Sequence, residues 1–182
     1  MKIWRTRNPS RTPGGFLILI FALVGSAPPA LAQPHGSREW LKAELSSFEQ
    51  VPTVLASGHG DFTAVINPDQ SIAYRLSYAD MSSGVTGAHL HFGASHTNGG
   101  VIAFLCGASA RPCPRSGTLA GTLRPGDVSP LPAGHHDSVI PQGIATGDWT
   151  ALVNALRSGD AYVNVHTQIF PSGEIRGQVH LR

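Results

Sequence analysis

The chain has 182 residues, of which 41% are hydrophobic, and carries 13 Lys and Arg against 11 Asp and Glu, a formal net charge of +2. Four of the basic residues and none of the acidic ones lie in the first 32 positions, so the rest of the chain is formally slightly acidic, with nine basic and eleven acidic side chains. These nine stand singly, which excludes the concentrated basic surface that nucleic-acid binding requires.

The N-terminal segment has the pattern of a cleaved secretory signal. Basic residues precede an apolar run over residues 16–24, and Ala30-Leu31-Ala32 follows as a small-residue cleavage site. The run is far shorter than the roughly 20 apolar residues that span a bilayer, and no Cys follows Ala32 to carry a lipid. We therefore predict that residues 1–32 are a signal peptide and that the mature protein is secreted or periplasmic, without a stable membrane anchor.

The residues after the predicted cleavage site are expected to form one domain. Residues 33–40 should be a flexible N-terminus and residues 41–182 the domain itself. Short apolar runs alternate there with Gly, Asn, Asp and Pro, which is typical of antiparallel strands. Asn67-Pro68-Asp69-Gln70 predicts a turn that joins two of them as a hairpin. The expected strands cover residues 41–46, 58–67, 71–78, 86–93 and 100–106.

The composition changes between residues 107 and 147, which are rich in Pro, Gly, Ser and Ala. We expect a long surface loop there with one strand over residues 117–123. One short helix near residues 148–157 follows, with Asp148 as its N-cap and Gly159 as its C-terminal stop.

The C-terminal region predicts a hairpin with one polar face. Apolar side chains occupy the odd positions of residues 161–167 and recur along 175–181, while polar or aromatic side chains stand at the even positions. If the two strands share a face, this pattern sets His166 opposite Arg176. Many short strands with a single helix indicate a mainly β fold, either an antiparallel β-sandwich or a partly open barrel.

Two cysteines, Cys106 and Cys113, lie in the exported part of the chain. An oxidising compartment favours a disulfide between them, and the six residues between them are small or turn-forming. A metal site that uses both thiols is the alternative.

The candidate chemistry is carried by three histidines. His89 and His91 are two residues apart, so a strand projects both from one face, and His166 on the polar face of the hairpin is the third candidate. Three imidazoles can hold zinc or copper. Asn164, Glu174 and Arg176 stand on the same predicted face as His166 and could orient the ligands, whereas Arg176 could instead form an ion pair with Glu174.

Two other interpretations of these histidines stay open. They can be hydrogen-bonded polar residues between two sheets or along a groove, with no metal. A hydrolytic role would need a nucleophile, and the sequence has no Gly-x-Ser-x-Gly motif. A further group, His135-His136-Asp137, could also bind a metal. Adjacent histidines point apart on a strand, however, and the Pro and Gly residues around them predict an exposed loop.

Several of these segments together resemble the CHRD domain, which is named after chordin and also occurs as a single exported unit. They are Gly87-Ala88-His89-Leu90-His91-Phe92-Gly93, the run 101–107, the helix 147–159, and Tyr162-Val163-Asn164-Val165-His166-Thr167 with Gly173-Glu174-Ile175-Arg176-Gly177-Gln178. The resemblance covers about residues 41–181 and implies an immunoglobulin-like or barrel-like extracellular module. A usual Phe-Glu-Glu-Val-Pro stands here as Phe48-Glu49-Gln50-Val51-Pro52, so a role for its second carboxylate is in doubt.

The resemblance implies a non-catalytic binding or structural module whose partner is an extracellular protein or a metal ion. It brings no established catalytic residues, and no von Willebrand type C module accompanies it, so growth-factor antagonism does not carry over from chordin. The alternative function is a copper- or zinc-binding protein or metalloenzyme. His-x-His on a strand is also similar to copper/zinc superoxide dismutase, but the remaining histidines lack the spacing of the dismutase zinc loop.

Overall fold

The computed structural model describes residues 37–108, 110–129, 131–132 and 134–182, so the predicted signal peptide lies outside the described residues. The described chain folds into antiparallel strands with one α-helix, α1 (Trp149–Ser158). The strands are β1 (Glu39–Ser46), β2 (His59–Ile66), β3 (Ile72–Ala79), β4 (Val85–Phe92), β5 (Gly100–Gly107), β6 (Gly117–Leu123), β7 (Ala161–Thr167), β8 (Ile175–Gln178) and β9 (His180–Leu181).

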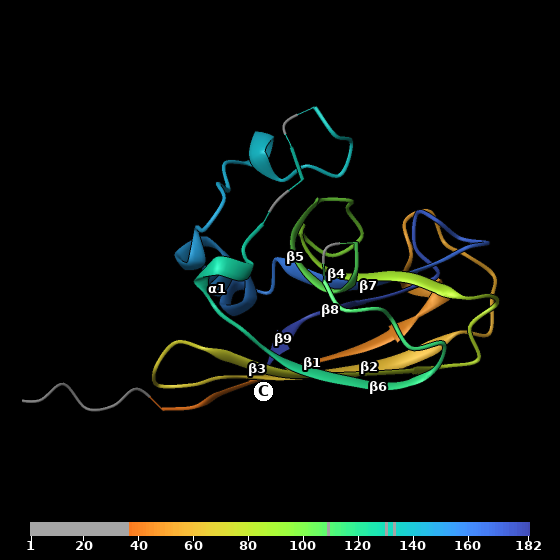
Figure 1. Cartoon of the computed structure of the whole chain (residues 1–182), viewed down its shortest axis with the longest axis horizontal. Helices are drawn as coiled ribbons and strands as arrows, with labels where there is room; N and C mark the ends of the chain where they lie inside the picture. The colour runs from red at the N-terminus through yellow and green to blue at the C-terminus, as the bar shows by residue number, and fades with distance from the viewer. Residues whose placement is uncertain (1–36, 109, 130, 133) are drawn as a thin grey trace, which may run out of the picture. The chain divides into compact units, whose positions relative to one another are not determined.

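All strands belong to one sheet with the order β5-β4-β7-β8-β1-β2-β3-β6, and β9 pairs with β1. Figure 1 shows this sheet curling over so that β4, β5 and β7 face β1, β2, β3 and β6 across the core. The mainly β prediction is confirmed, in the form of a nearly closed barrel. The turn over residues 67–70 joins β2 and β3 as predicted.

The pattern of side chains along β1 explains why the sheet closes. Leu41, Ala43 and Leu45 are almost fully buried, whereas Lys42 and Glu44 between them are exposed. Burial of one apolar face per strand is the main favourable term in such a fold. Tyr74 reaches across the core and donates its hydroxyl to the carbonyl of Leu105 at 3.2 Å.

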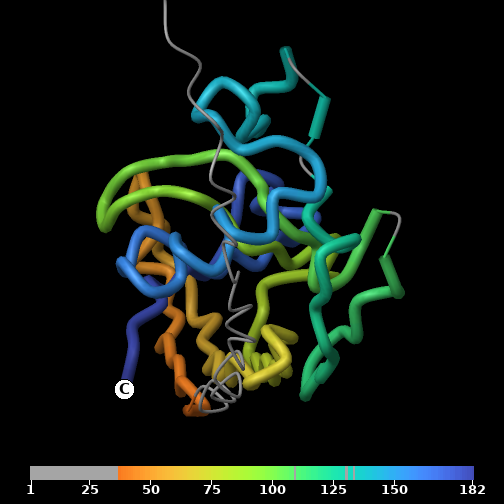
Figure 2. The backbone as a smooth tube through the Cα atoms, turned by 90° about the vertical axis from the view of Figure 1, so that its left-hand side faces the viewer, coloured from red at the N-terminus to blue at the C-terminus, as the bar shows by residue number. Residues whose placement is uncertain are grey.

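Strand β7 differs because both of its faces are buried. Its odd-numbered residues pack in the core, and its even-numbered residues face away from it. Loops cover this second face: segment 93–99 accepts hydrogen bonds from side chains of β4, β7 and β8, and the side chain of Gln142 donates to the backbone of β4. Figures 1 and 2 show these loops gathered above the strands.

The predicted pairing of His166 with Arg176 is wrong, because Arg176 stands opposite Asn164. The reason lies in the connection, which folds around Phe170. The carbonyl of Phe170 accepts the backbone N–H groups of both Thr167 and Gly173, so the hairpin centres on this residue. The strands still share a polar face, displaced by two residues from the expected register.

The predicted long loop after residue 107 is only partly a surface element. Two isolated bridges pair Val128 with Ala103 and Ser138 with Val101, both on β5. Val128 and Val139 are 0% exposed. Val128 and Val139 are single apolar residues in a Pro-rich stretch and do not form the alternating pattern of a strand. The sequence pattern therefore did not predict that this segment attaches to β5.

The helix has the predicted ends. The carboxylate of Asp148 accepts the backbone N–H of Ala151 at 3.0 Å, and Gly159 adopts a left-handed conformation with φ 79°. The predicted disulfide between Cys106 and Cys113 is also present. It closes the loop that leaves β5, where Gly107 donates to the carbonyl of Arg111 at 2.9 Å.

The disulfide should stabilise the domain by restricting the unfolded chain. In a double variant, Cys106→Ala with Cys113→Ala, we expect the free energy of unfolding to fall by about 2–3 kcal/mol, as the loop-closure entropy of so short a ring suggests. Urea unfolding followed by tryptophan fluorescence measures this. Reduction of the parent protein should reproduce the loss and leave the variant unaffected; an unchanged urea midpoint in the variant would contradict the prediction.

Candidate metal centre

The pairing of β4 with β7 brings the three candidate histidines together. His89 stands opposite Asn164, His91 opposite Tyr162, and His166 opposite Gly87. The ring centres of His89 and His166 lie 4.7 Å apart, those of His89 and His91 5.7 Å apart, and those of His91 and His166 6.0 Å apart. One ring nitrogen from each histidine lies within 4.8 Å of the other two.

Gly87 leaves the space that the His89 ring occupies. A Cβ atom at this position would lie only 2.9 Å from His89 Nε2. Any larger residue would therefore displace the His89 ring from its position beside His166. On the other side, the edge of Phe104 packs against His89 with 4.6 Å between ring centres.

Backbone carbonyls fix the orientation of two of the rings. Nδ1 of His91 lies 3.0 Å from the carbonyl of Gly99, and Nδ1 of His166 lies 2.9 Å from the carbonyl of Pro171. Because a carbonyl can only accept a hydrogen bond, both Nδ1 atoms carry the proton. In a neutral imidazole the lone pair then lies on Nε2.

The nitrogens left over are buried and unpaired. Within the described part of the chain, Nδ1 of His89 and Nε2 of His91 and His166 each expose less than 1 Å² to solvent and have no hydrogen-bond partner. Buried polar atoms are nearly always hydrogen-bonded. Three exceptions in one cluster are typical of a site built for a ligand that accepts nitrogen lone pairs.

The environment keeps the three rings neutral. Burial lowers the pKa of His89 to about 2, assisted by the charges that His166 and His91 would carry if protonated. Burial also lowers the pKa of His91 to about 3, against the opposing effect of its bond to Gly99. The pKa of His166 is lowered for the same main reason. Neutral imidazole is the form that ligates metals.

The three polar residues predicted to orient the ligands make their hydrogen bonds elsewhere. Asn164 accepts the amide of Gln50 at 2.6 Å and donates to the carbonyl of Ser172. Gln50 is the residue that replaces the usual second carboxylate of the family segment, and its amide here acts as a donor. These contacts tie the 47–57 loop to the hairpin.

Glu174 is fully buried and accepts three hydrogen bonds. Its carboxylate takes the backbone N–H and hydroxyl of Ser82 at 2.8 and 3.0 Å, and the hydroxyl of Thr167 at 2.7 Å. Arg176 instead donates to the carbonyls of Thr97 and Ala94. The two side chains therefore do not form the ion pair that the sequence allowed.

A stack of three side chains borders the site, and the sequence did not single out its middle member. The guanidinium carbon of Arg176 lies 3.5 Å from the centre of the Tyr162 ring. The Tyr162 ring also stacks on His91, with 4.8 Å between the ring centres and an angle of 12°. Tyr162 and His166 both stand at even positions of the same strand, and this was the only sequence signal that could have placed Tyr162 on the same face as the histidine.

A small hollow of about 230 Å³ reaches His89 and His166 from the surface. His135 and Asp137 lie at its rim together with apolar residues such as Val101 and Leu131. The predicted exposure of the 135–137 segment is correct for its histidines. Their rings do not point apart but stack with 4.5 Å between ring centres, and Nε2 of His136 lies 2.8 Å from the carboxylate of Asp137.

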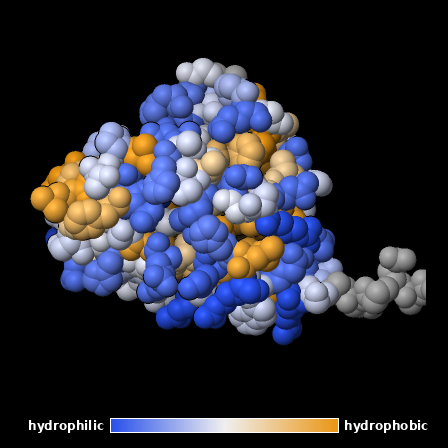
Figure 3. All heavy atoms as spheres, turned by 180° about the vertical axis from the view of Figure 1, so that it is seen from behind, coloured by the Kyte–Doolittle hydropathy of each residue, from blue (hydrophilic) through white to orange (hydrophobic). Residues whose placement is uncertain are grey.

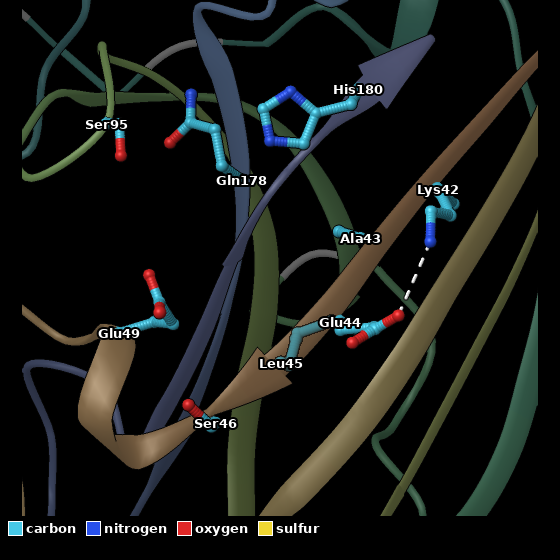
Figure 4. Close-up of a pocket in the computed structure, with 9 residues that line it drawn as sticks. All are labelled: Lys42, Ala43, Glu44, Leu45, Ser46, Glu49, Ser95, Gln178 and His180. Carbon is cyan, nitrogen blue, oxygen red and sulfur yellow. Dashed lines mark hydrogen bonds and ion pairs between the residues drawn. The ribbon is translucent and has the colours of Figure 1, made fainter. Parts of the chain in front are cut away.

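Two surface features lie away from the histidines. A larger hollow of about 520 Å³, shown in Figure 4, is lined by residues of β1 together with polar side chains such as Glu49, Gln178 and His180, and its Lys42 and Glu44 are already paired at 3.4 Å. Exposed apolar side chains, among them Phe48, Leu55 and Ile169, belong to the 47–57 and 168–173 loops. Figure 3 shows hydrophobic residues gathered at one end of the molecule. Such groups mark contact surfaces.

The comparisons with known proteins bear on the family. No curated protein and no solved structure gives a match. No helix in the described ranges is long and apolar enough to cross a membrane. Residues 41–179 match the CHRD domain, which covers most of the chain. The chain therefore belongs to the CHRD domain family.

Proposed function

We propose that this CHRD domain is an exported, non-catalytic binding module that holds one transition-metal ion, copper or zinc, through His89, His91 and His166. The observation that carries the proposal is the closeness of the three histidines, which each place one ring nitrogen within 4.8 Å of the others and each have one buried ring nitrogen without a hydrogen-bond partner in the described part of the chain. Imidazole nitrogens suit both metals.

The cost of the metal-free arrangement favours this function over a purely structural role. A buried polar atom without a partner costs about 1–3 kcal/mol, and this cluster has three. Hydrogen-bonded filler residues would not incur that cost. In addition, the carbonyls of Gly99 and Pro171 hold the rings in the tautomer that a metal needs, as partners of ligating histidines generally do.

Several features support the non-catalytic and exported parts of the proposal. The hollow that reaches His89 and His166 is small, about 230 Å³, and the unpaired ring nitrogens expose less than 1 Å² each, which hinders the approach of a large substrate. Both cysteines are joined in a disulfide and so offer no nucleophile. A disulfide also suits an oxidising compartment, and the exposed apolar loops offer a surface for an extracellular protein partner.

Loss of one ligand should abolish tight binding. We expect His166→Ala to weaken copper or zinc affinity by at least about 100-fold, beyond the ~10–100-fold typical of losing a group that only orients a ligand. Chelator competition and elemental analysis of the purified protein measure this. His59→Ala, at an exposed histidine far from the cluster, is the matched control. Equal copper or zinc affinity in the two variants, or the absence of bound metal in the parent protein, would contradict the proposal.

The metal-free protein should lose stability in acid. Because the folded-state pKa values of His89 and His91 are about 2 and 3 and that of an unfolded chain is about 6.5, the unfolded state binds more protons below pH 6.5. As the pH falls below about 6.5, the free energy of unfolding should therefore decrease by up to about 1.4 kcal/mol per pH unit for each buried histidine.

Urea unfolding between pH 7 and pH 5 measures this dependence. His91→Gln should show a shallower loss, since it removes one of the buried imidazoles, and His59→Gln should match the parent. A His91→Gln profile as steep as that of the parent would contradict the assignment of a neutral buried ring at this position.

A further inference from the structure

We infer that the site selects monovalent copper, Cu(I), over Zn(II) and Cu(II), and that Arg176 contributes to this preference. The inference rests on the proposed function and names its ligand. It follows from two independent properties of the site: the number of ligands that it can supply, and the charge that it can tolerate.

The protein supplies the ion with three ligands, and the hollow of about 230 Å³ is the route by which solvent reaches His89 and His166. The three nitrogens expose less than 1 Å² each, with Phe104 packed against His89 and Tyr162 flat on His91. Zinc with three protein ligands keeps a water in a fourth position, and Cu(II) prefers a tetragonal arrangement. Cu(I) has a filled d shell and accepts trigonal coordination, so it is the ion that needs no additional ligand.

The spacing of the nitrogens is compatible with such an ion. Metal–nitrogen bonds of about 2.0 Å in a trigonal site separate the ligand atoms by about 3.5 Å. The nitrogens lie within 4.8 Å of one another. Each ring therefore needs only a small rotation that moves its nitrogen inward by on the order of 1 Å. The hydrogen bonds from Nδ1 of His91 and His166 are compatible with so small a rotation.

The charge around the site disfavours a divalent ion. All three imidazole ligands are neutral. The buried carboxylate of Glu174, which is close to His166 in the sequence, accepts hydrogen bonds from Ser82 and Thr167 instead of facing the ion. The cost of burying an ion in a low-dielectric interior rises with the square of its charge, so a divalent ion costs about four times as much as a monovalent one. Without a charged ligand, the site compensates the charge of a divalent ion less than a site with a carboxylate or thiolate ligand would.

Arg176 adds to this effect. Arg176 is 2% exposed, and its guanidinium lies over Tyr162 and donates to carbonyls. The carboxylate whose charge acts on it, that of Glu49, is exposed to solvent. The Tyr162 ring that contacts the guanidinium also stacks on His91. The opposite charge that acts on His166 is that of Asp137, whose side chain is 40% exposed and paired with His136, so that solvent weakens its influence.

The test compares three ions on the purified mature protein. Cu(I) affinity is measured anaerobically by competition with bicinchoninate under ascorbate, and Zn(II) and Cu(II) affinities by competition with chelators. We expect Cu(I) to bind at least ~100-fold more tightly than either divalent ion, each tenfold corresponding to about 1.4 kcal/mol. Equal or tighter binding of Zn(II) or Cu(II) would overturn the inference while leaving the proposed function intact, whereas no binding of any ion would overturn both.

Two variants test the part assigned to Arg176. Arg176→Gln removes the charge and should reduce the ratio of Cu(I) to Zn(II) affinity by about tenfold, whereas Arg176→Lys keeps the charge and should retain most of the ratio. Near-ultraviolet circular dichroism confirms that each variant keeps the parent fold. The role of Arg176 fails if both variants keep the parent ratio or both lose it equally; the three-ion comparison on the parent needs neither variant.

Discussion

The register between β4 and β7 is the constraint on which the rest of the site depends. Ala88 and Leu90 on one strand and Val163 and Val165 on the other are all 0% exposed and pack in the core. A slip of one residue would send these side chains to the opposite face and place the histidines in hydrocarbon. The hydrophobic effect thus fixes the positions of the histidines, although none of them contributes to the apolar core.

A sheet with a buried polar second face needs a cover that supplies hydrogen-bond partners. The loops provide this cover with backbone carbonyls: Gly99 for His91, Pro171 for His166, and Thr97 for Arg176. Carbonyls accept and do not donate, so at His91 and His166 they leave the second ring nitrogen with a free lone pair. The strands therefore set the positions of the polar side chains on this face, and the loop carbonyls set their orientations and the proton positions on the His91 and His166 rings.

Much of the fold could be predicted from local signals. The strand periodicity, the turn over residues 67–70, the caps at Asp148 and Gly159 and the disulfide each depend on a few neighbouring residues, and the structure has all of them. The histidine cluster was suggested by parity alone, since side chains two residues apart on a strand must share a face. The metal itself remains a prediction.

The features that the sequence did not predict correctly are contacts between segments distant in sequence and the geometry of one turn. The register of the C-terminal hairpin depends on Phe170 accepting two backbone bonds, which no side-chain pattern encodes. The attachment of the 128–139 segment to β5 depends on single apolar anchors. The carbonyls that orient the histidines are available from any residue type, so the sequence could suggest only side chains such as Asn164 for that role.

The site and the exposed apolar surface share one segment of chain. Pro171 holds His166 through its carbonyl, and it also lines a small hollow beside Val51 and Ile169 on the outer surface. Asn164 connects the same two loops by accepting from Gln50 and donating to Ser172. Because the segment that orients His166 also forms part of the exposed apolar surface, the orientation of His166 and the shape of that surface are coupled.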